Sequence, residues 1–175
     1  HLIIGKVGGS KALKELKNYL KIHKIKNYQD QKEKKNFKIA YSKQLDSKSK
    51  KEFKKIMNYY GDLKIKHKIL DYLLHKFKIK VKTKDFYLSK KEIKYLSSLG
   101  MIIGCHSESH NLLSRLSYKN QFKEIKRSKT FLEKIIKKKI NIFCYPYGGK
   151  ISYDKNTLKI LRDLKFKQAY SVDNR

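Results

Sequence analysis

Two histidines four residues apart, His106 and His110, are the side chains of this chain best suited to carry out chemistry. They follow a short apolar run, Met101 to Ile103, and a glycine, Gly104. This order is typical of a strand that ends in a ligand-bearing loop. If the loop forms one helical turn, both imidazoles lie on one face, with Cβ atoms about 5–6 Å apart. Two neutral imidazoles placed in this way can bind one divalent ion.

A catalytic metal site that keeps a position open for water needs a third protein ligand, which is usually a carboxylate. Glu108 lies between the histidines, but a residue two positions along a helix points elsewhere, so it is a poor candidate. The His-x-x-x-His spacing is also common in solvated loops, and taken alone it indicates a coincidence more often than a metal site. The surrounding pattern is what favours the metal site.

A second unusual loop, Tyr145-Pro146-Tyr147-Gly148-Gly149, follows another apolar run, Ile140 to Cys144. By itself it would be a plain turn with two packing aromatic residues. Helices are predicted from Ser89, with Glu92 completing a capping box, from Ser117 and from about Asp154, and a third strand is predicted over 167–172. Strands that alternate with helices are typical of a parallel sheet, in which both loops open at the same edge, where α/β folds hold their sites.

The first half of the chain predicts lysine-rich helices without recognisable chemistry. Apolar residues at helical spacing predict helices over about 10–23 and 47–60, and a third from Gly61 to about Phe77. The polar segment between the first two is predicted to be irregular, with a short alternating strand at Phe37, Ile39 and Tyr41. The three histidines that fall on these helices are interpreted as surface or boundary residues: His23, His67 and His75.

The charge balance is extreme, with 45 Lys and Arg against 15 Asp and Glu, a formal net charge of +30. Such a field attracts nucleic acid, anionic glycan or an anionic membrane surface. The positive charge is nearly all lysine and is spread along the chain, whereas specific recognition of phosphates and bases favours arginine. We therefore expect solvated helix faces and no specific nucleic-acid partner.

Compartment and redox state are weakly constrained. No apolar run approaches the ~20 residues of a transmembrane helix, and no signal peptide opens the chain. Cytoplasmic and cell-envelope locations both stay open. The two cysteines, Cys105 and Cys144, are too few for a disulfide scaffold and are interpreted as small residues at strand ends.

Taken together, the segments 104–117 and 143–148 resemble the polysaccharide deacetylase family. That family carries a His-[Ser/Thr]-x-x-His loop and, further along, a Pro-Tyr-Gly loop, and here the two loops are separated by roughly 35 residues. The resemblance covers about residues 86–173. It implies a partial distorted (β/α) barrel over 86–175, preceded by a lysine-rich helical insertion over 1–85.

The resemblance implies a hydrolase that removes acetyl groups from N-acetylated sugars of a polysaccharide or bacterial surface glycan. It further implies a divalent metal cofactor, for which zinc is expected. His106 and His110 match the family's two metal-binding histidines, and Ser107 matches the small hydroxyl residue that steadies their loop.

The second loop supplies the implied substrate contacts. Tyr147 matches a tyrosine whose backbone N–H helps to hold the oxyanion and whose ring lines the sugar site, and Pro146 fixes that backbone. Tyr145 offers an aromatic face on which a pyranose could stack. Cys144 stands where the family often has arginine, so the group that orients a catalytic acid there must come from elsewhere.

The chain also departs from the family because it contains no Asp-Asp pair. The general base, an aspartate ligand and the late histidine expected as general acid are therefore predicted to lie outside this chain, which we interpret as a fragment with little activity alone. Two other functions stay open. One is a basic nucleic-acid-binding module, and the other is a non-catalytic helical interaction domain with a degenerate barrel remnant.

Overall fold

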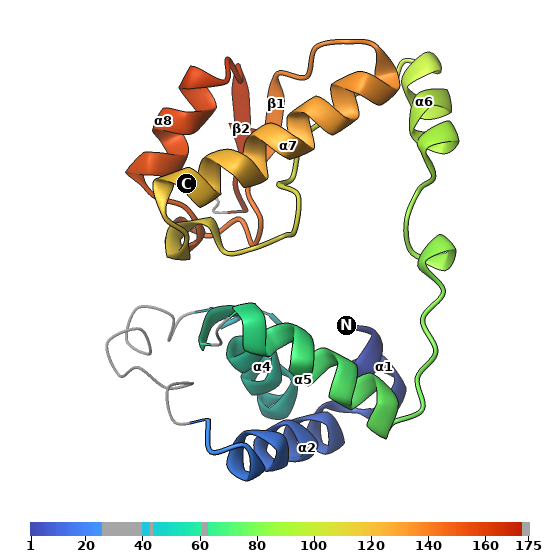
Figure 1. Ribbon diagram of the computed structural model, residues 1–175, viewed down its shortest axis with the longest axis vertical. Coiled ribbons are helices and arrows are strands. Elements are labelled where there is room, and N and C mark those ends of the chain that lie inside the picture. The colour runs from blue at the N-terminus through green and yellow to red at the C-terminus, as the bar shows by residue number, and fades with distance from the viewer. Residues whose placement is uncertain (26–39, 43, 61–62, 173–175) are drawn as a thin grey trace. The chain divides into compact units, whose positions relative to one another are not determined.

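A computed structural model describes residues 1–25, 40–42, 44–60 and 63–172 (Figure 1). The chain divides into two compact units, His1–Val81 and Lys82–Arg175. The described residues combine helices and strands, and most of the regular structure is helical.

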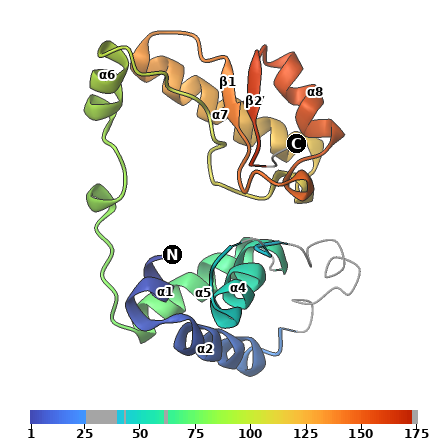
Figure 2. The same ribbon diagram turned by 180° about the vertical axis from the view of Figure 1, so that it is seen from behind.

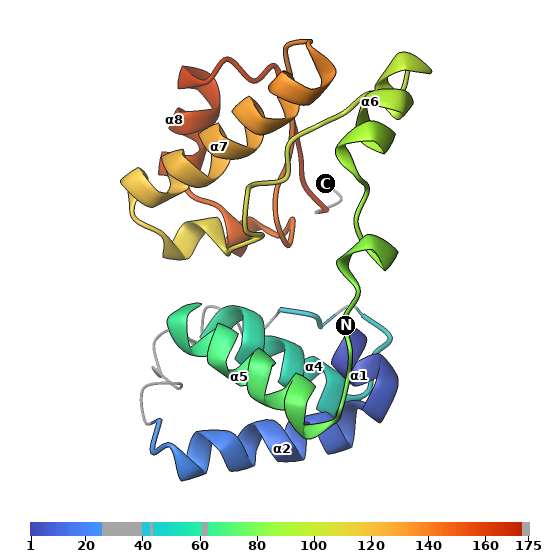
Figure 3. The same ribbon diagram turned by 45° about the vertical axis from the view of Figure 1, so that its right-hand side comes forward.

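The first unit contains only helices among its described residues (Figure 3). They are α1 (Leu2–Val7), α2 (Gly9–Ile22), α4 (Lys48–Lys55), a π-helical turn (Ile56–Tyr60) and α5 (Leu63–Lys76). The apolar stripes predicted from the sequence form their core, in which Leu16, Ile69 and Leu73 are fully buried. Of the predicted short strand, Phe37 and Ile39 lie outside the described residues, and Tyr41 lies in a turn.

Over its described residues, 82–172, the second unit contains three α-helices and two short strands. They are α6 (Lys90–Ser98), α7 (Tyr118–Ile136), β1 (Ile142–Cys144), α8 (Lys155–Asp163) and β2 (Gln168–Tyr170), together with 3-10 turns at Thr83–Asp85, Leu113–Arg115 and Lys150–Ser152. The predicted helix starts are confirmed. Ser89 and Glu92 form the capping box of α6, and Ser117 caps α7.

The strands β1 and β2 pair in parallel, with Phe143 opposite Ala169. On the other side of β1, Cys105 forms a parallel bridge with Phe143, and its N–H donates to the Ile142 carbonyl oxygen at 2.9 Å. The parallel arrangement that we predicted is therefore present. The predicted strand over 101–104 is wrong, because only the next residue, Cys105, pairs with β1.

Helix α7 covers one face of this small sheet: it lies in front of the strands in Figure 1 and behind them in Figure 2. Their shared core includes Cys105, Leu113, Ile125, Phe143 and Ile160, each with no exposed surface. Among the residues that the structure describes, the sheet has two strands, so it shows the predicted mixture of helices and parallel strands but not a barrel.

A buried polar network joins α7 to α8. The Thr157 hydroxyl donates to the Gln121 side-chain oxygen at 2.6 Å, and both residues are fully buried. Asp154, which caps α8, accepts from the Gln121 amide at 3.2 Å. The network fixes the end of α8 against the helix that supports the histidine loop.

Candidate active site

The histidine loop brings its two imidazoles together, but not through a helical turn. Residues 106–110 form an irregular bend in which Ser107 (φ 61°) and His110 (φ 52°) adopt left-handed conformations. The helical turn that we considered for this loop does not form. The ring centroids nevertheless lie 4.7 Å apart, at an interplanar angle of 67°. Left-handed residues other than glycine are uncommon and cluster at functional sites.

The orientation of His106 is set by the main chain of β1. Its Nδ1 lies 2.9 Å from the carbonyl oxygen of Cys144. A carbonyl oxygen only accepts hydrogen bonds, so Nδ1 carries the proton, and in the neutral ring Nε2 presents the lone pair. Histidines that bind metals usually have their second ring nitrogen held in this way. No sequence pattern indicates this role for Cys144, because every residue has a carbonyl group.

The tyrosine of the second loop lies against the second histidine. The Tyr147 and His110 ring centroids are 4.8 Å apart, at an interplanar angle of 72°. Tyr147 (φ 65°) and Gly148 (φ 69°) are both left-handed, and the Gly148 carbonyl oxygen accepts from the Val172 N–H at 3.1 Å. Pro146, just before this turn, is fully buried. The two loops therefore meet, as their places after neighbouring strands predict.

Tyr145 has a different environment from the one we expected. Its ring is 6% exposed and stacks on Tyr153, with centroids 3.9 Å apart and an interplanar angle of 15°. Burial, reinforced by Tyr153, raises the pKa of Tyr145 to about 12. The expected sugar-stacking face is thus occupied within the protein, and Tyr145 has a packing role instead.

Ser107 lies where the resemblance places it, but its hydroxyl does not hold the loop. Its Oγ is buried and has no hydrogen-bond partner among the described residues. Its contribution to the shape of the loop is therefore the left-handed backbone that it adopts between the two histidines.

The metal-binding set is incomplete in the part of the chain that the structure describes. There, no group of three or more His, Cys, Asp or Glu side chains is arranged to hold a metal ion. The two imidazoles still fit a divalent cation in type and spacing, because neutral histidine is a common ligand of such metals. A metal site built on this pair would need at least one more ligand.

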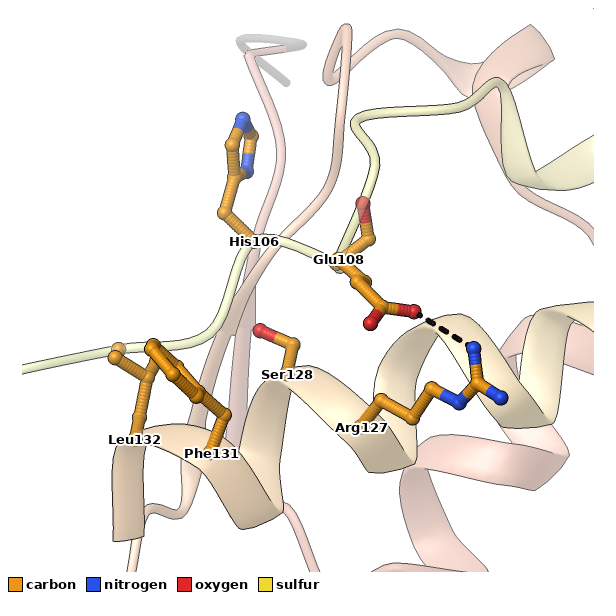
Figure 4. Close-up of a pocket in the computed structure, with 8 residues that line it drawn as sticks. His106, Glu108, Arg127, Ser128, Phe131 and Leu132 are labelled. Atoms are coloured by element: carbon orange, nitrogen blue, oxygen red, sulfur yellow. Dashed lines mark hydrogen bonds and ion pairs between the residues drawn. The ribbon is translucent and has the colours of Figure 1, made fainter. Parts of the chain in front are cut away.

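A pocket of about 430 Å³ lies on the α7 side of the same loop (Figure 4). It is lined by residues of the 104–108 segment and by Arg127, Ser128, Phe131 and Leu132 of α7. The His106 ring points away from these α7 side chains (Figure 4). The pocket therefore borders the histidine loop, and His106 and Ser107 are among its lining residues.

The chain is similar to known proteins. A family model for polysaccharide deacetylase matches residues 44–169. Among solved structures, the Streptococcus pyogenes deacetylase PplD in complex with acetate is similar, with 24% sequence identity and a TM-score of 0.44. The match covers 59% of this chain and 47% of PplD, so the chain spans about half the length of that structure. A search of curated proteins found no match.

Proposed function

The chain belongs to the polysaccharide deacetylase family. We propose that it functions in a metal-dependent hydrolase that removes acetyl groups from N-acetylated sugars of a polysaccharide or surface glycan. One observation carries the proposal: the His106 and His110 rings lie 4.7 Å apart, with Tyr147 packed against the second of them. The convergence of two loops on one point is what a hydrolytic centre requires, because the acyl group must be bound and polarised in the same place.

His106 and His110 are the residues that would hold the cation, for which we propose zinc. Nε2 of His106 is available as a lone-pair donor because Nδ1 donates to the Cys144 carbonyl oxygen. A divalent cation bound there would polarise the acetyl carbonyl and lower the pKa of a coordinated water. A third ligand, an aspartate, is proposed to come from outside the described residues.

Tyr147 is proposed as the residue that acts on the substrate. Its peptide N–H would donate to the acetyl oxygen as negative charge develops there, and a preorganised donor of this kind stabilises the transition state. Its ring would line the sugar site beside His110. Pro146 would fix the direction of this peptide, since the proline ring restricts the backbone that leads into it. The general base and general acid are proposed to lie outside this chain.

The two units receive different roles in this proposal. We assign the chemistry to the second unit, as part of a (β/α) barrel, and interpret residues 1–85 as a lysine-rich helical insertion. The family match begins at Gln44, so it includes part of this insertion. Among the described residues, no helix combines the length and apolar character needed to cross a membrane.

The metal proposal is tested by titrating zinc into the chain by calorimetry, with His106→Ala, His110→Ala and a control, His67→Ala. His67 is an exposed histidine on α5, in the other unit. Removing either imidazole of the pair should weaken binding at least tenfold, a loss of about 1.4 kcal/mol, and the control should bind like wild type. Equal affinities for all four proteins would refute the metal site.

The proposed reaction is tested separately by following acetate release from N-acetylated oligosaccharides. The protein used should include the proposed aspartate ligand, with Tyr147→Phe and His110→Ala as variants. Tyr147→Phe should retain turnover because it preserves the peptide N–H, and His110→Ala should abolish it. Turnover that is unaffected by His110→Ala would exclude the proposed mechanism.

A further inference from the structure

One carboxylate holds the histidine loop on both sides of His110. The Ser109 N–H donates to Oε2 of Glu124 at 2.8 Å, and the Asn111 side-chain amide donates to Oε1 of the same residue at 3.2 Å. The residues before and after His110 are therefore both tied to a single side chain of α7. Hydrogen bonds to an ionised carboxylate are stronger than those between neutral groups.

The position of Glu124 follows from the packing of α7. Ile125, the next residue, is fully buried in the core of the second unit, so this part of the helix is held against the sheet. One turn further on, Arg127 forms an ion pair with Glu108 at 3.4 Å, shown by the dashed line in Figure 4. Both partners of that pair are exposed, and such pairs contribute little. The two bonds to Glu124 form a second link between α7 and the loop, in which the Asn111 bond is partly buried and the Ser109 bond is exposed.

We propose that Glu124 is a positioning residue for His110. A left-handed histidine (φ 52°) persists only when the surrounding contacts impose it. By fixing the peptide before His110 and the side chain after it, Glu124 keeps the ring beside His106. The inference rests on the proposed function, because it gives Glu124 a role toward the metal. The holding of the loop by itself does not depend on a metal.

The zinc affinity of two variants tests the inference. Glu124→Ala removes both bonds and should lower the affinity between tenfold and a hundredfold, as is typical when a group that orients a ligand is lost. The double variant Asn111→Asp/Glu124→Gln exchanges the charge between the two positions. Its glutamine can accept from the Ser109 N–H and donate to the new carboxylate at position 111, so wild-type affinity should return. Lys123→Ala, a neighbouring exposed position on α7, should bind zinc like wild type.

A metal-free measurement separates this inference from the proposed function. In nuclear magnetic resonance spectra, Glu124→Ala should accelerate hydrogen exchange of the Ser109 amide and remove the contact between the ring protons of His106 and His110. The double variant should restore both signals. If wild type binds no zinc but these signals respond as expected, the metal proposal fails and the positioning role is supported.

Two results would overturn the positioning role. One is that Glu124→Ala leaves zinc affinity, amide exchange and the ring contact unchanged. The other is that the double variant fails to restore them, which would mean that the paired bonds are not what holds the loop. If Glu124→Ala does not fold, as judged by far-UV circular dichroism, Asn111→Ala replaces it. That variant removes one of the two bonds, and the same changes are expected at reduced size.

Discussion

Replacing Gly148 with alanine tests the geometry of the loop that carries Tyr147. At φ 69° a residue with a Cβ atom is strained by roughly 1–2 kcal/mol. The added Cβ would also lie 2.6 Å and 2.9 Å from the two γ-carbons of Val172 and 3.0 Å from its backbone nitrogen. Val172 is 69% exposed and can shift, so we take the low end of the overpacking range, about 1 kcal/mol. The expected loss in the free energy of unfolding is about 2–3 kcal/mol.

The assay is urea unfolding followed by far-UV circular dichroism. Gly149→Ala is a matched control, because Gly149 has an ordinary φ of −79° and a Cβ there would meet nothing within 4 Å. Its effect should stay within about 0.5 kcal/mol. Adding Val172→Ala to Gly148→Ala removes both γ-carbons, so it should recover the part of the loss that they cause. The backbone strain and the close contact with the Val172 nitrogen should remain. If Gly148→Ala unfolded with the same free energy as Gly149→Ala, the geometry described for this turn would be wrong.

Three further predictions concern the second unit. Thr157→Val leaves the buried amide oxygen on α7 without its donor and should lower the free energy of unfolding by about 1–3 kcal/mol in the same assay; no loss would contradict a stabilising network. Burial raises the pKa of Cys105 to about 11, whereas Cys144 is exposed, so iodoacetamide should label only Cys144 in the folded protein and both thiols in urea, as read by peptide mass spectrometry. Hydrogen bonds from Ser89 hold the pKa of Glu92 below its ordinary value, so the stability that this carboxylate adds is present above that ordinary value and is lost as the pH falls through the lowered one. The stability difference between wild type and Glu92→Gln should therefore shrink in acid, and a difference independent of pH would contradict this assignment.

The helices were predictable because their signals are local. The capping box at Ser89 and Glu92 involves residues three positions apart. The apolar residues of α7 recur at each turn of the helix, so their pattern is also visible over a short stretch of sequence. Parallel pairing also followed from the alternation of strands and helices. Residues 101–104 were predicted as a strand from their apolar character alone. Apolar character does not reveal whether a neighbouring strand is present to pair with these residues.

The details of the site depend on contacts between distant residues. The bend of the histidine loop could not be read from the sequence. It depends on left-handed backbone at Ser107 and His110, and neither is glycine, the residue type that usually marks such a backbone. Glu124 lies well beyond the loop in sequence and looks like any charged helical residue. Tyr145 was misassigned because an aromatic ring that stacks on Tyr153 is chemically the same as one that stacks on a sugar.

The contact between His106 and the carbonyl oxygen of Cys144 has an evolutionary consequence. The accepting atom belongs to the polypeptide backbone, so a residue of any type at position 144 offers it, provided that β1 keeps its course. Selection on the imidazole therefore places no demand on the side chain at that position. Covariation between the two positions would be absent, and an alignment would not reveal a contact on which the direction of the ring depends.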